Sequence, residues 1–231
     1  MEWERWMPQV IHDVRTLVRK GLSSAQLLER SLGANADPEA RVWLDSMISS
    51  QRDLNALMTR VGMLASASAV GRPVREELID LDTALLGMRL RSRDALTESS
   101  AELQIVALPN CMVPVRLDTV WTELLENSIR FRDPDRPLRI SIEAGSDETA
   151  LWVQFEDNGA GWDAALSSRL FQPFQRLSAR KGGAGLGLAI ARTIVESTGG
   201  QICAEPRAPG ARFRVTIPVG GCFKAQDERG D

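Results

Sequence analysis

The sequence predicts an α+β protein in which an antiparallel helical hairpin precedes a mixed α/β domain. Apolar residues recur at three- and four-residue steps over about the first 70 residues, as in amphipathic helices. Short alternating segments between helices follow. The 231 residues, 43% apolar and 26% charged, suffice for two modest domains. We therefore expect domains at residues 1–70 and 71–219 and a disordered tail at 220–231.

The first expected helix ends before Gly33 and carries a seam of coiled-coil type. Pro8 lacks a backbone donor, so we expect the regular helix to begin there. The seam comprises Trp3, Met7, Val10, Val14, Leu17, Ala25, Leu28 and Leu32.

Asp37-Pro38-Glu39 predicts the start of a second helix, because it supplies an N-cap, a proline at the first helical position and an acidic first turn. Two helices with a short connection form an antiparallel hairpin. Each has one apolar stripe, so we expect a second copy of the chain to complete a dimeric four-helix bundle. The second seam comprises Leu44, Met47, Ile48, Leu54, Leu57, Val61, Leu64 and Ala67.

The second domain alternates short strands with helices. We expect helices at residues 117–131 and 185–197, and strands at residues 103–108, 138–142, 151–155 and 212–218. This pattern predicts a mixed α/β domain.

Composition argues against several classes of function. The net charge of -3, with mixed signs, provides no basic stripe for nucleic acid. Cys111, Cys203 and Cys222 lack metal-ligand spacing, and they indicate reduced thiols in a cytoplasmic protein. No apolar run approaches the roughly 20 residues that cross a bilayer. We expect no nucleic-acid partner and no membrane contact in this chain.

Two groups of residues in the second domain indicate a ligand site. Glu123 and Asn127 lie four residues apart on an expected helix, so they share a face, and Arg130 and Phe131 follow. Asp157-Asn158-Gly159-Ala160-Gly161 comes directly after an alternating strand. Its glycines let a ligand ring approach the backbone closely.

A third group, Gly183-Ala184-Gly185-Leu186-Gly187-Leu188, opens an expected helix, whose first N–H groups form an anion site. Such a segment could also belong to a dinucleotide-binding fold. However, no strand of a βαβ unit leads into it, and no acidic residue follows at the distance that fold requires. Each of the three groups alone is common in turns and on surfaces.

Taken in order, the three groups resemble the Bergerat-type ATP-binding domain of histidine kinases, gyrase and mismatch-repair ATPases, from about Glu76 to Val219. The resemblance implies that Asn127 holds Mg²⁺ at the phosphates and that Glu123 orients or activates the attacking group. It also implies that Asp157 accepts a hydrogen bond from the adenine amino group.

The same resemblance assigns the remaining site residues. Arg130 is expected at the phosphates, and Phe131 is expected beside the adenine. The first glycine box leaves room for the base, and the backbone of the second glycine box closes on the phosphates. These boxes comprise Gly159 and Gly161, then Gly183, Gly185, Leu186 and Gly187.

The segment Leu170–Leu177 resembles the phenylalanine box of histidine kinases, which gyrase-type enzymes lack. A short lid follows, rich in Arg176, Arg180, Lys181 and Gly182. The lid and the segment Asn127–Arg132 are similar to those of bacterial phytochrome-type kinases.

His12 is the single histidine of the chain. It lies about 200° around the helix from Val10 and from Val14, so we expect it in solvent. An isolated surface histidine usually has no role. However, His12-Asp13-Val14-Arg15-Thr16 resembles the histidine box of sensor kinases. The resemblance implies that His12 is the phosphoacceptor, that Asp13 fixes its tautomer and that Thr16 positions water during dephosphorylation of the partner.

Two positions depart from the family pattern. Leu17 stands where a proline is usual, and Thr198 stands before Gly199-Gly200 where a histidine is common. The first concerns the helix bend that frees the histidine, and the second is peripheral to the chemistry.

The resemblance therefore implies a homodimeric sensor histidine kinase that uses ATP and Mg²⁺ to phosphorylate His12. Its partner is the receiver domain of a response regulator, and its sensor domain lies upstream in the full-length protein or in a separate chain. Two alternatives stay open. One is a histidine phosphotransferase or scaffold without kinase activity, and the other is an ATPase or serine kinase of the same superfamily.

Overall fold

The computed structural model describes residues 3–32, 37–68, 77–106, 108–175 and 184–218. The chain divides into two compact units, Met1–Ala69 and Val70–Asp231. The functions assigned to residues 1–70 and 71–219 stay predictions, and the tail expected at 220–231 lies outside the described residues. Within the described residues, none of the helices is both long and apolar enough to span a bilayer.

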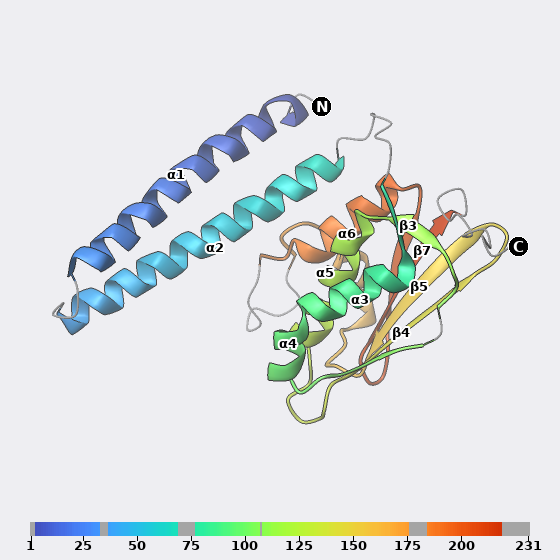
Figure 1. Cartoon of the computed structure of the whole chain (residues 1–231). Helices are drawn as coiled ribbons and strands as arrows, with labels where there is room; N and C mark the ends of the chain where they lie inside the picture. Colours follow the sequence, from blue (N-terminus) through green and yellow to red (C-terminus); the bar gives the residue numbers. More distant parts are fainter. Residues whose placement is uncertain (1–2, 33–36, 69–76, 107, 176–183, 219–231) are drawn as a thin grey trace, which may run out of the picture. The chain divides into compact units, whose positions relative to one another are not determined.

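The first unit is a hairpin of α1 (Trp3–Leu32) and α2 (Pro38–Ser68) (Figure 1). The helices are antiparallel, because Arg15 in the first half of α1 donates to the Met58 carbonyl in the second half of α2 at 3.4 Å. Helix α1 begins at Trp3, so the predicted start at Pro8 is wrong. A proline this close to a helix N-terminus removes only one backbone hydrogen bond.

The buried stripe of α1 is shifted by one residue from the predicted seam. It consists of Ile11, Val18 and Ala25, spaced by seven residues. The prediction is confirmed for Ala25 and, on α2, for Leu44 and Ile48, which form one cluster. It is wrong within this hairpin for Val10, Leu17, Leu28, Leu32, Met47 and Leu54, which are exposed. A seven-residue spacing fits either of two adjacent stripes on a helix, so spacing alone does not choose between them.

The second unit contains a mixed five-stranded sheet in the order β2-β4-β5-β7-β6. Strand β2 pairs parallel with β4, and the other neighbours pair antiparallel. A separate antiparallel pair joins β1 and β3. The strands are β1 (Leu78–Asp80), β2 (Glu102–Ile105), β3 (Met112–Pro114), β4 (Arg139–Ser146), β5 (Ala150–Asp157), β6 (Gln201–Pro206) and β7 (Ala211–Pro218).

Helices cover one face of this sheet (Figure 1). They are α3 (Leu81–Arg91), α4 (Arg93–Glu98), α5 (Leu117–Arg130) and α6 (Gly187–Ser197), with a 3₁₀ turn, η2 (Ala164–Arg169). The expected α/β organisation is confirmed, including the helices later seen as α5 and α6 and the strands seen as β4, β5 and β7. Helix α3 and strand β6 are absent from the sequence prediction.

The core lies between α5, α6 and the helix-facing side of the sheet. Strand β5 alternates strictly, so Leu151, Val153 and Phe155 are buried. Trp121 of α5 stacks on Phe155, with ring centroids 6.0 Å apart and planes at 10°. This aromatic pair fixes α5 against the strand that ends at Asp157.

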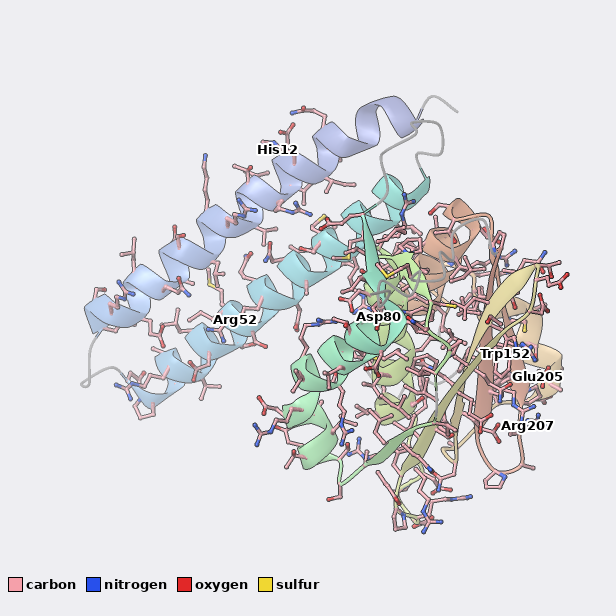
Figure 2. All side chains as sticks on the ribbon, turned by 45° about the vertical axis from the view of Figure 1, so that its right-hand side comes forward. His12, Arg52, Asp80, Trp152, Glu205 and Arg207 are labelled. Atoms are coloured by element: carbon pink, nitrogen blue, oxygen red, sulfur yellow. The ribbon has the colours of Figure 1, made fainter. Side chains whose placement is uncertain are left out.

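The opposite face of the sheet is polar. The guanidinium of Arg214 lies 4.6 Å from the ring centroid of Trp152, and Arg212 pairs with Glu156 at 2.6 Å. Figure 2 shows Trp152 and Glu205 on the side of the sheet that faces away from the helices. The unit therefore has a single apolar layer between its helices and its sheet.

Phe155→Ala is expected to lower the free energy of unfolding of the second unit by about 3–5 kcal/mol, because it removes a fully buried ring and its stacking contact with Trp121. Urea unfolding followed by circular dichroism measures this. Gln154→Ala, on the opposite face of the same strand, is the matched control, with an expected change within about 0.5 kcal/mol. Equal effects of the two substitutions would contradict the position of the core.

Candidate functional site

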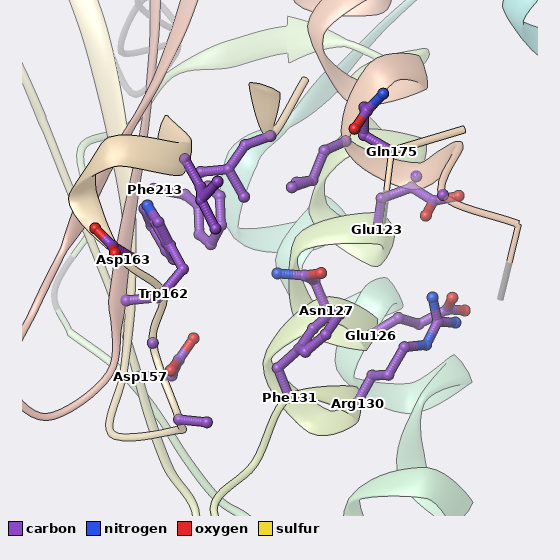
Figure 3. Close-up of a pocket in the computed structure, with 18 residues that line it drawn as sticks. Glu123, Glu126, Asn127, Arg130, Phe131, Asp157, Trp162, Asp163, Gln175 and Phe213 are labelled. Atoms are coloured by element: carbon purple, nitrogen blue, oxygen red, sulfur yellow. The ribbon is translucent and has the colours of Figure 1, made fainter. Parts of the chain in front are cut away.

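A cavity of about 290 Å³ in the second unit brings together most of the site residues that the sequence predicts. It lies between α5, the end of β5, the start of α6 and β7 (Figure 3). The predicted residues that line it are Glu123, Asn127, Arg130, Phe131, Asp157, Gly161, Gly185 and Gly187. Gly159 follows Asp157 in the same loop, Leu186 directly precedes α6, and Gly183 lies outside the described residues.

Helix α5 supplies one wall of the cavity. Glu123, Asn127 and Arg130 recur at steps of four and three residues, so they lie on one face of the helix. The neighbouring Leu124 and Leu125 are fully buried. The same amphipathic pattern that packs α5 into the core thus presents its polar residues to the cavity (Figure 3).

Asp157 ends β5 at the base of the cavity and is only 7% exposed. Its Oδ1 accepts a hydrogen bond from the Gly159 N–H at 2.9 Å, and its Oδ2 accepts one from the Ser128 hydroxyl at 2.9 Å. Burial raises the pKa of Asp157, and the two hydrogen bonds oppose that rise. Asp157 is thus a buried acceptor whose orientation is fixed from two sides.

The loop after β5 is attached to the end of α5. The Ala160 N–H donates to the Phe131 carbonyl at 2.9 Å. A Cβ atom at Gly159 would lie 2.8 Å from the same carbonyl oxygen, so only glycine fits this close approach. Asn158 has a structural role, because its side chain bonds to the Arg139 N–H at 2.8 Å and to the Pro137 carbonyl at 3.0 Å.

The start of α6 forms the opposite end of the cavity. Its N-cap residue, Leu186, provides no side-chain acceptor for the first N–H groups of the helix. The Gly185 carbonyl accepts a hydrogen bond from the Phe174 N–H at 2.9 Å, which holds Gly185 next to Phe174. The N–H groups at such a helix start favour an anion.

The charges of the lining residues suit a divalent cation together with a polyphosphate. Among the described lining residues, Arg130 carries a positive charge. Four others carry carboxylates: Glu123, Glu126, Asp157 and Asp163. Asn127 and Glu123 offer oxygen atoms, the ligands that Mg²⁺ prefers. In the described part of the chain, no three metal-binding side chains gather into a complete metal site. The oxygen atoms of Asn127 and Glu123 suit a cation that also keeps water and phosphate ligands.

In the first unit, His12 is 74% exposed, which confirms the sequence prediction of its position. Its Nδ1 lies 3.2 Å from Asp13 Oδ1, and the Gln9 side chain donates to the same oxygen at 2.9 Å. The hydrogen bond from His12, followed by that from Gln9, lowers the pKa of Asp13. The Thr16 hydroxyl donates to the His12 carbonyl at 3.0 Å.

Several residues of the cavity are absent from the sequence prediction. Trp162 and Phe213 line it, Ser128 holds Asp157, and Gly210 packs against the Asp157 backbone. Two signals were available in the sequence. Trp162 directly follows Gly161, and Ser128 directly follows Asn127. Phe213 and Gly210 lie more than fifty residues beyond Asp157 in the sequence, and only the folded sheet brings them to the site.

These features define the class of the second unit, an ATP-binding ATPase domain. Residues 112–221 match the family described as histidine kinase-, DNA gyrase B-, and HSP90-like ATPase. The chain is 31% identical to cyanobacterial phytochrome A of Nostoc sp. over 91% of its length, and 29% identical to the sensor protein TorS of Escherichia coli over 92%. The second unit therefore carries an ATPase domain of this family, and the chain is similar to sensor histidine kinases over about nine-tenths of its length.

Solved structures show the same fold. Full-length ShkA in complex with AMPPNP has a TM-score of 0.76 over 91% of this chain and 44% of its own, at 22% identity. The histidine kinase AdeS of Acinetobacter baumannii has a TM-score of 0.65 over 90% of this chain and 97% of its own, at 20% identity. The present chain spans 28% of the phytochrome and 22% of TorS.

Asp157→Asn is expected to stabilise the second unit at neutral pH and to weaken ATP binding by about tenfold or more. The pKa of Asp157 in the folded state lies above the ordinary value of 3.8. At pH values between the unfolded-state pKa and the folded-state pKa, the folded protein therefore binds more protons than the unfolded protein. The free energy of unfolding consequently falls as the pH rises through this window. At pH values above this window, the full free-energy cost of the buried Asp157 charge is present, and the neutral asparagine side chain removes that cost. Thermal melting and calorimetric ATP titration measure the two effects.

Asp147→Asn is the matched control, because hydrogen bonds from Thr149 and Ala150 lower the pKa of Asp147. It is expected to give no gain in melting temperature and no change in ATP affinity. The stabilisation by Asp157→Asn is expected to shrink as the pH approaches 3.8. A lower melting temperature for Asp157→Asn at pH 7 would contradict the cost assigned to the buried charge.

Gly210→Ala is expected to weaken ATP binding by about tenfold. Gly210 has φ of +98°, and a Cβ atom there would lie 1.8 Å from the Asp157 carbonyl oxygen, so alanine must displace Asp157. Gly199→Ala is the control, since φ is +76° but the nearest atom, in Pro218, is 3.5 Å away. Gly199→Ala is expected to introduce backbone strain similar to that of Gly210→Ala, about 1 kcal/mol, and to leave ATP binding unchanged. Equal ATP affinity in the two variants argues against the dependence of Asp157 on Gly210.

Proposed function

We propose that this chain uses ATP and Mg²⁺ to phosphorylate His12 and passes the phosphoryl group to an aspartate of a response regulator. One observation supports this above the others. A single chain combines an ATPase domain of histidine kinase type with an exposed imidazole that is hydrogen-bonded to the neighbouring carboxylate. Sensor proteins are similar to the chain across both parts.

The cavity accommodates ATP with its base at Asp157 and its phosphates toward α6. Asp157 accepts a hydrogen bond from the adenine amino group, while Gly159 and Gly161 leave room for the ring. Phe131 lies beside the base and Arg130 meets the phosphates. The backbone of the second glycine box closes on them through Gly185, Leu186 and Gly187, and the proposal assigns the same role to Gly183, which lies outside the described residues. The complex of ShkA with AMPPNP supports an adenine nucleotide in this fold.

In this proposal Asn127 holds Mg²⁺, and Glu123 acts on the attacking group. The metal, when bound, offsets the charge of the phosphates. Asn127 supplies a ligand oxygen, and Glu123 orients the attacking group from the same face of α5. The chain's own contribution to the reaction is therefore mainly positioning.

His12 is the nucleophile. Asp13 holds the proton on Nδ1, so the lone pair of Nε2 is available to attack the γ-phosphorus. The Nε2–P bond forms as the bond from phosphorus to the β,γ-bridging oxygen breaks, and ADP leaves with that oxygen. The carboxylate of Asp13 stabilises the positive charge that develops on the ring.

The phosphorylated His12 then donates to the receiver domain of a response regulator, and Thr16 positions water when the regulator is dephosphorylated. A second copy of the chain covers the exposed apolar stripe of Val10, Leu17 and Leu28, giving a dimeric four-helix bundle. The proposal includes a cytoplasmic location and an upstream sensor domain, in the same protein or in another chain.

Two alternative functions make different predictions. A histidine phosphotransferase or scaffold would carry label on His12 only when a phosphorylated partner supplies it. An ATPase or serine kinase of the superfamily would use ATP without a phosphohistidine. The set of Asp157, Asn127 and Glu123 in one cavity favours an active nucleotide site over the first alternative.

Incubation of the full chain with γ-labelled ATP and Mg²⁺ is expected to label the wild type and leave His12→Gln unlabelled. The label is expected to be lost in acid, because phosphohistidine is acid-labile and phosphoserine is not. Intact-mass measurement is expected to show one added phosphoryl group. ATP binding to His12→Gln is expected to match the wild type, since His12 belongs to the other unit.

Asp13→Asn is expected to slow labelling by a factor on the order of 10², because the amide no longer fixes the imidazole tautomer. Asp45→Asn, which replaces an exposed carboxylate on α2, is the matched control with an unchanged rate.

Acid-stable label, or equal label on wild type and His12→Gln, would contradict the proposed acceptor.

A further inference from the structure

Trp162 forms the wall of the cavity that faces α5. It follows Gly161, is half-buried, and lines the cavity together with Phe213 behind it (Figure 3). On the other side lie Asn127 of α5 and Phe131, the residue that caps the end of α5 (Figure 3). Asp157 lies at the base between these walls. The space therefore has three aromatic side chains and one buried acceptor.

Two contacts fix the orientation of the Trp162 ring. Its Nε1–H donates to the Ser167 hydroxyl at 2.9 Å. Its ring packs on Phe213, with centroids 5.6 Å apart and planes at 36°. Phe213 is 1% exposed and lies opposite Phe155 in the β5–β7 register, so this wall is anchored in the core. These two contacts hold the Trp162 ring in position, where it lines the cavity.

We infer that Trp162 is the stacking platform that makes this site prefer a purine base, and that Ser167 is the positioning residue that orients it. The inference rests on the proposed function, because the base is that of ATP. A flat ring that offers an amino group to Asp157 lies between the two walls and in contact with Trp162. Stacking on an aromatic side chain favours any nucleobase, and it favours the larger fused ring more.

The contributions of Asp157 and Trp162 to base selection are separable. A carboxylate accepts a hydrogen bond from the exocyclic amino group of adenine or cytosine and repels the carbonyl oxygen of guanine. Cytosine keeps the amino group but has a single ring. The ratio of ATP affinity to CTP affinity therefore measures the contribution of ring size, and Trp162 controls that ratio.

Calorimetric titration of the full chain with Mg²⁺-ATP and Mg²⁺-CTP tests the inference. Trp162→Ile is expected to weaken ATP binding by about tenfold or more and to lower the ATP-to-CTP affinity ratio. Trp162→Phe, which keeps an aromatic face, is expected to retain most of the affinity. Binding of inorganic tripolyphosphate with Mg²⁺ is expected to be unchanged in both variants.

Trp152→Ile is the matched control, because Trp152 lies on the opposite face of the sheet, against Arg214. It is expected to leave both nucleotide affinities unchanged. Thermal melting of each variant shows that the second unit is folded. A loss of ATP affinity in Trp152→Ile equal to that in Trp162→Ile would overturn the inference.

A double-mutant cycle tests the role of Ser167. Ser167→Ala is expected to weaken ATP binding several-fold in the wild type, because Trp162 loses its hydrogen bond. In a Trp162→Phe background the same change is expected to have no effect, since phenylalanine has no N–H group. Equal effects of Ser167→Ala in both backgrounds overturn the positioning role.

The outcomes separate this inference from the proposed function. If the wild type binds ATP and becomes phosphorylated on His12, but Trp162→Ile shows the wild-type affinity and the wild-type ATP-to-CTP ratio, the inference alone is overturned. If the wild type binds ATP without phosphorylation of His12 and Trp162→Ile lowers the ratio, the inference holds and the proposed kinase activity fails. Absence of ATP binding to the wild type overturns both.

Discussion

The nucleotide site depends on one buried carboxylate. Asp157 is held by the Ser128 hydroxyl from α5 and by the Gly159 N–H of its own loop, and Gly210 packs against its backbone. Three segments far apart in the sequence thus meet at one side chain. Burial makes the ionised form costly, and a folded protein retains such a cost where an oriented acceptor is required. The aromatic pair of Trp121 and Phe155 holds the two main elements together beneath it.

The sequence was sufficient to predict the elements with a strong period. Strand β5 alternates at every position and α5 is plainly amphipathic, so both were predicted close to their observed bounds. Helix α3 was missed because its leucines lie on all sides, with Leu85 buried and Leu86 exposed. Strand β6 was missed because it is a short edge strand with polar residues at its end. The hairpin seam was misplaced by one residue because two apolar stripes run side by side.

The predicted residues that the cavity brings together lie next to one another in motifs. Glu123 and Asn127 share a helix face, and Asp157 precedes its glycines, so local spacing was enough. Phe213 and Gly210 reach the same cavity through the pairing of β5 with β7, which no local pattern encodes. Ser128 and Trp162 stood beside predicted residues. Their roles come from hydrogen bonds that form only after folding, to Asp157 and Ser167 respectively.

The single exposed histidine has a practical consequence for following the chemistry in solution. With one histidine per chain, the imidazole region of a nitrogen NMR spectrum contains the signals of His12 alone. Its ring is 74% exposed, so solvent reaches it directly. Its tautomer and its modification could therefore be read from one unambiguous set of resonances, without mutagenesis to assign them.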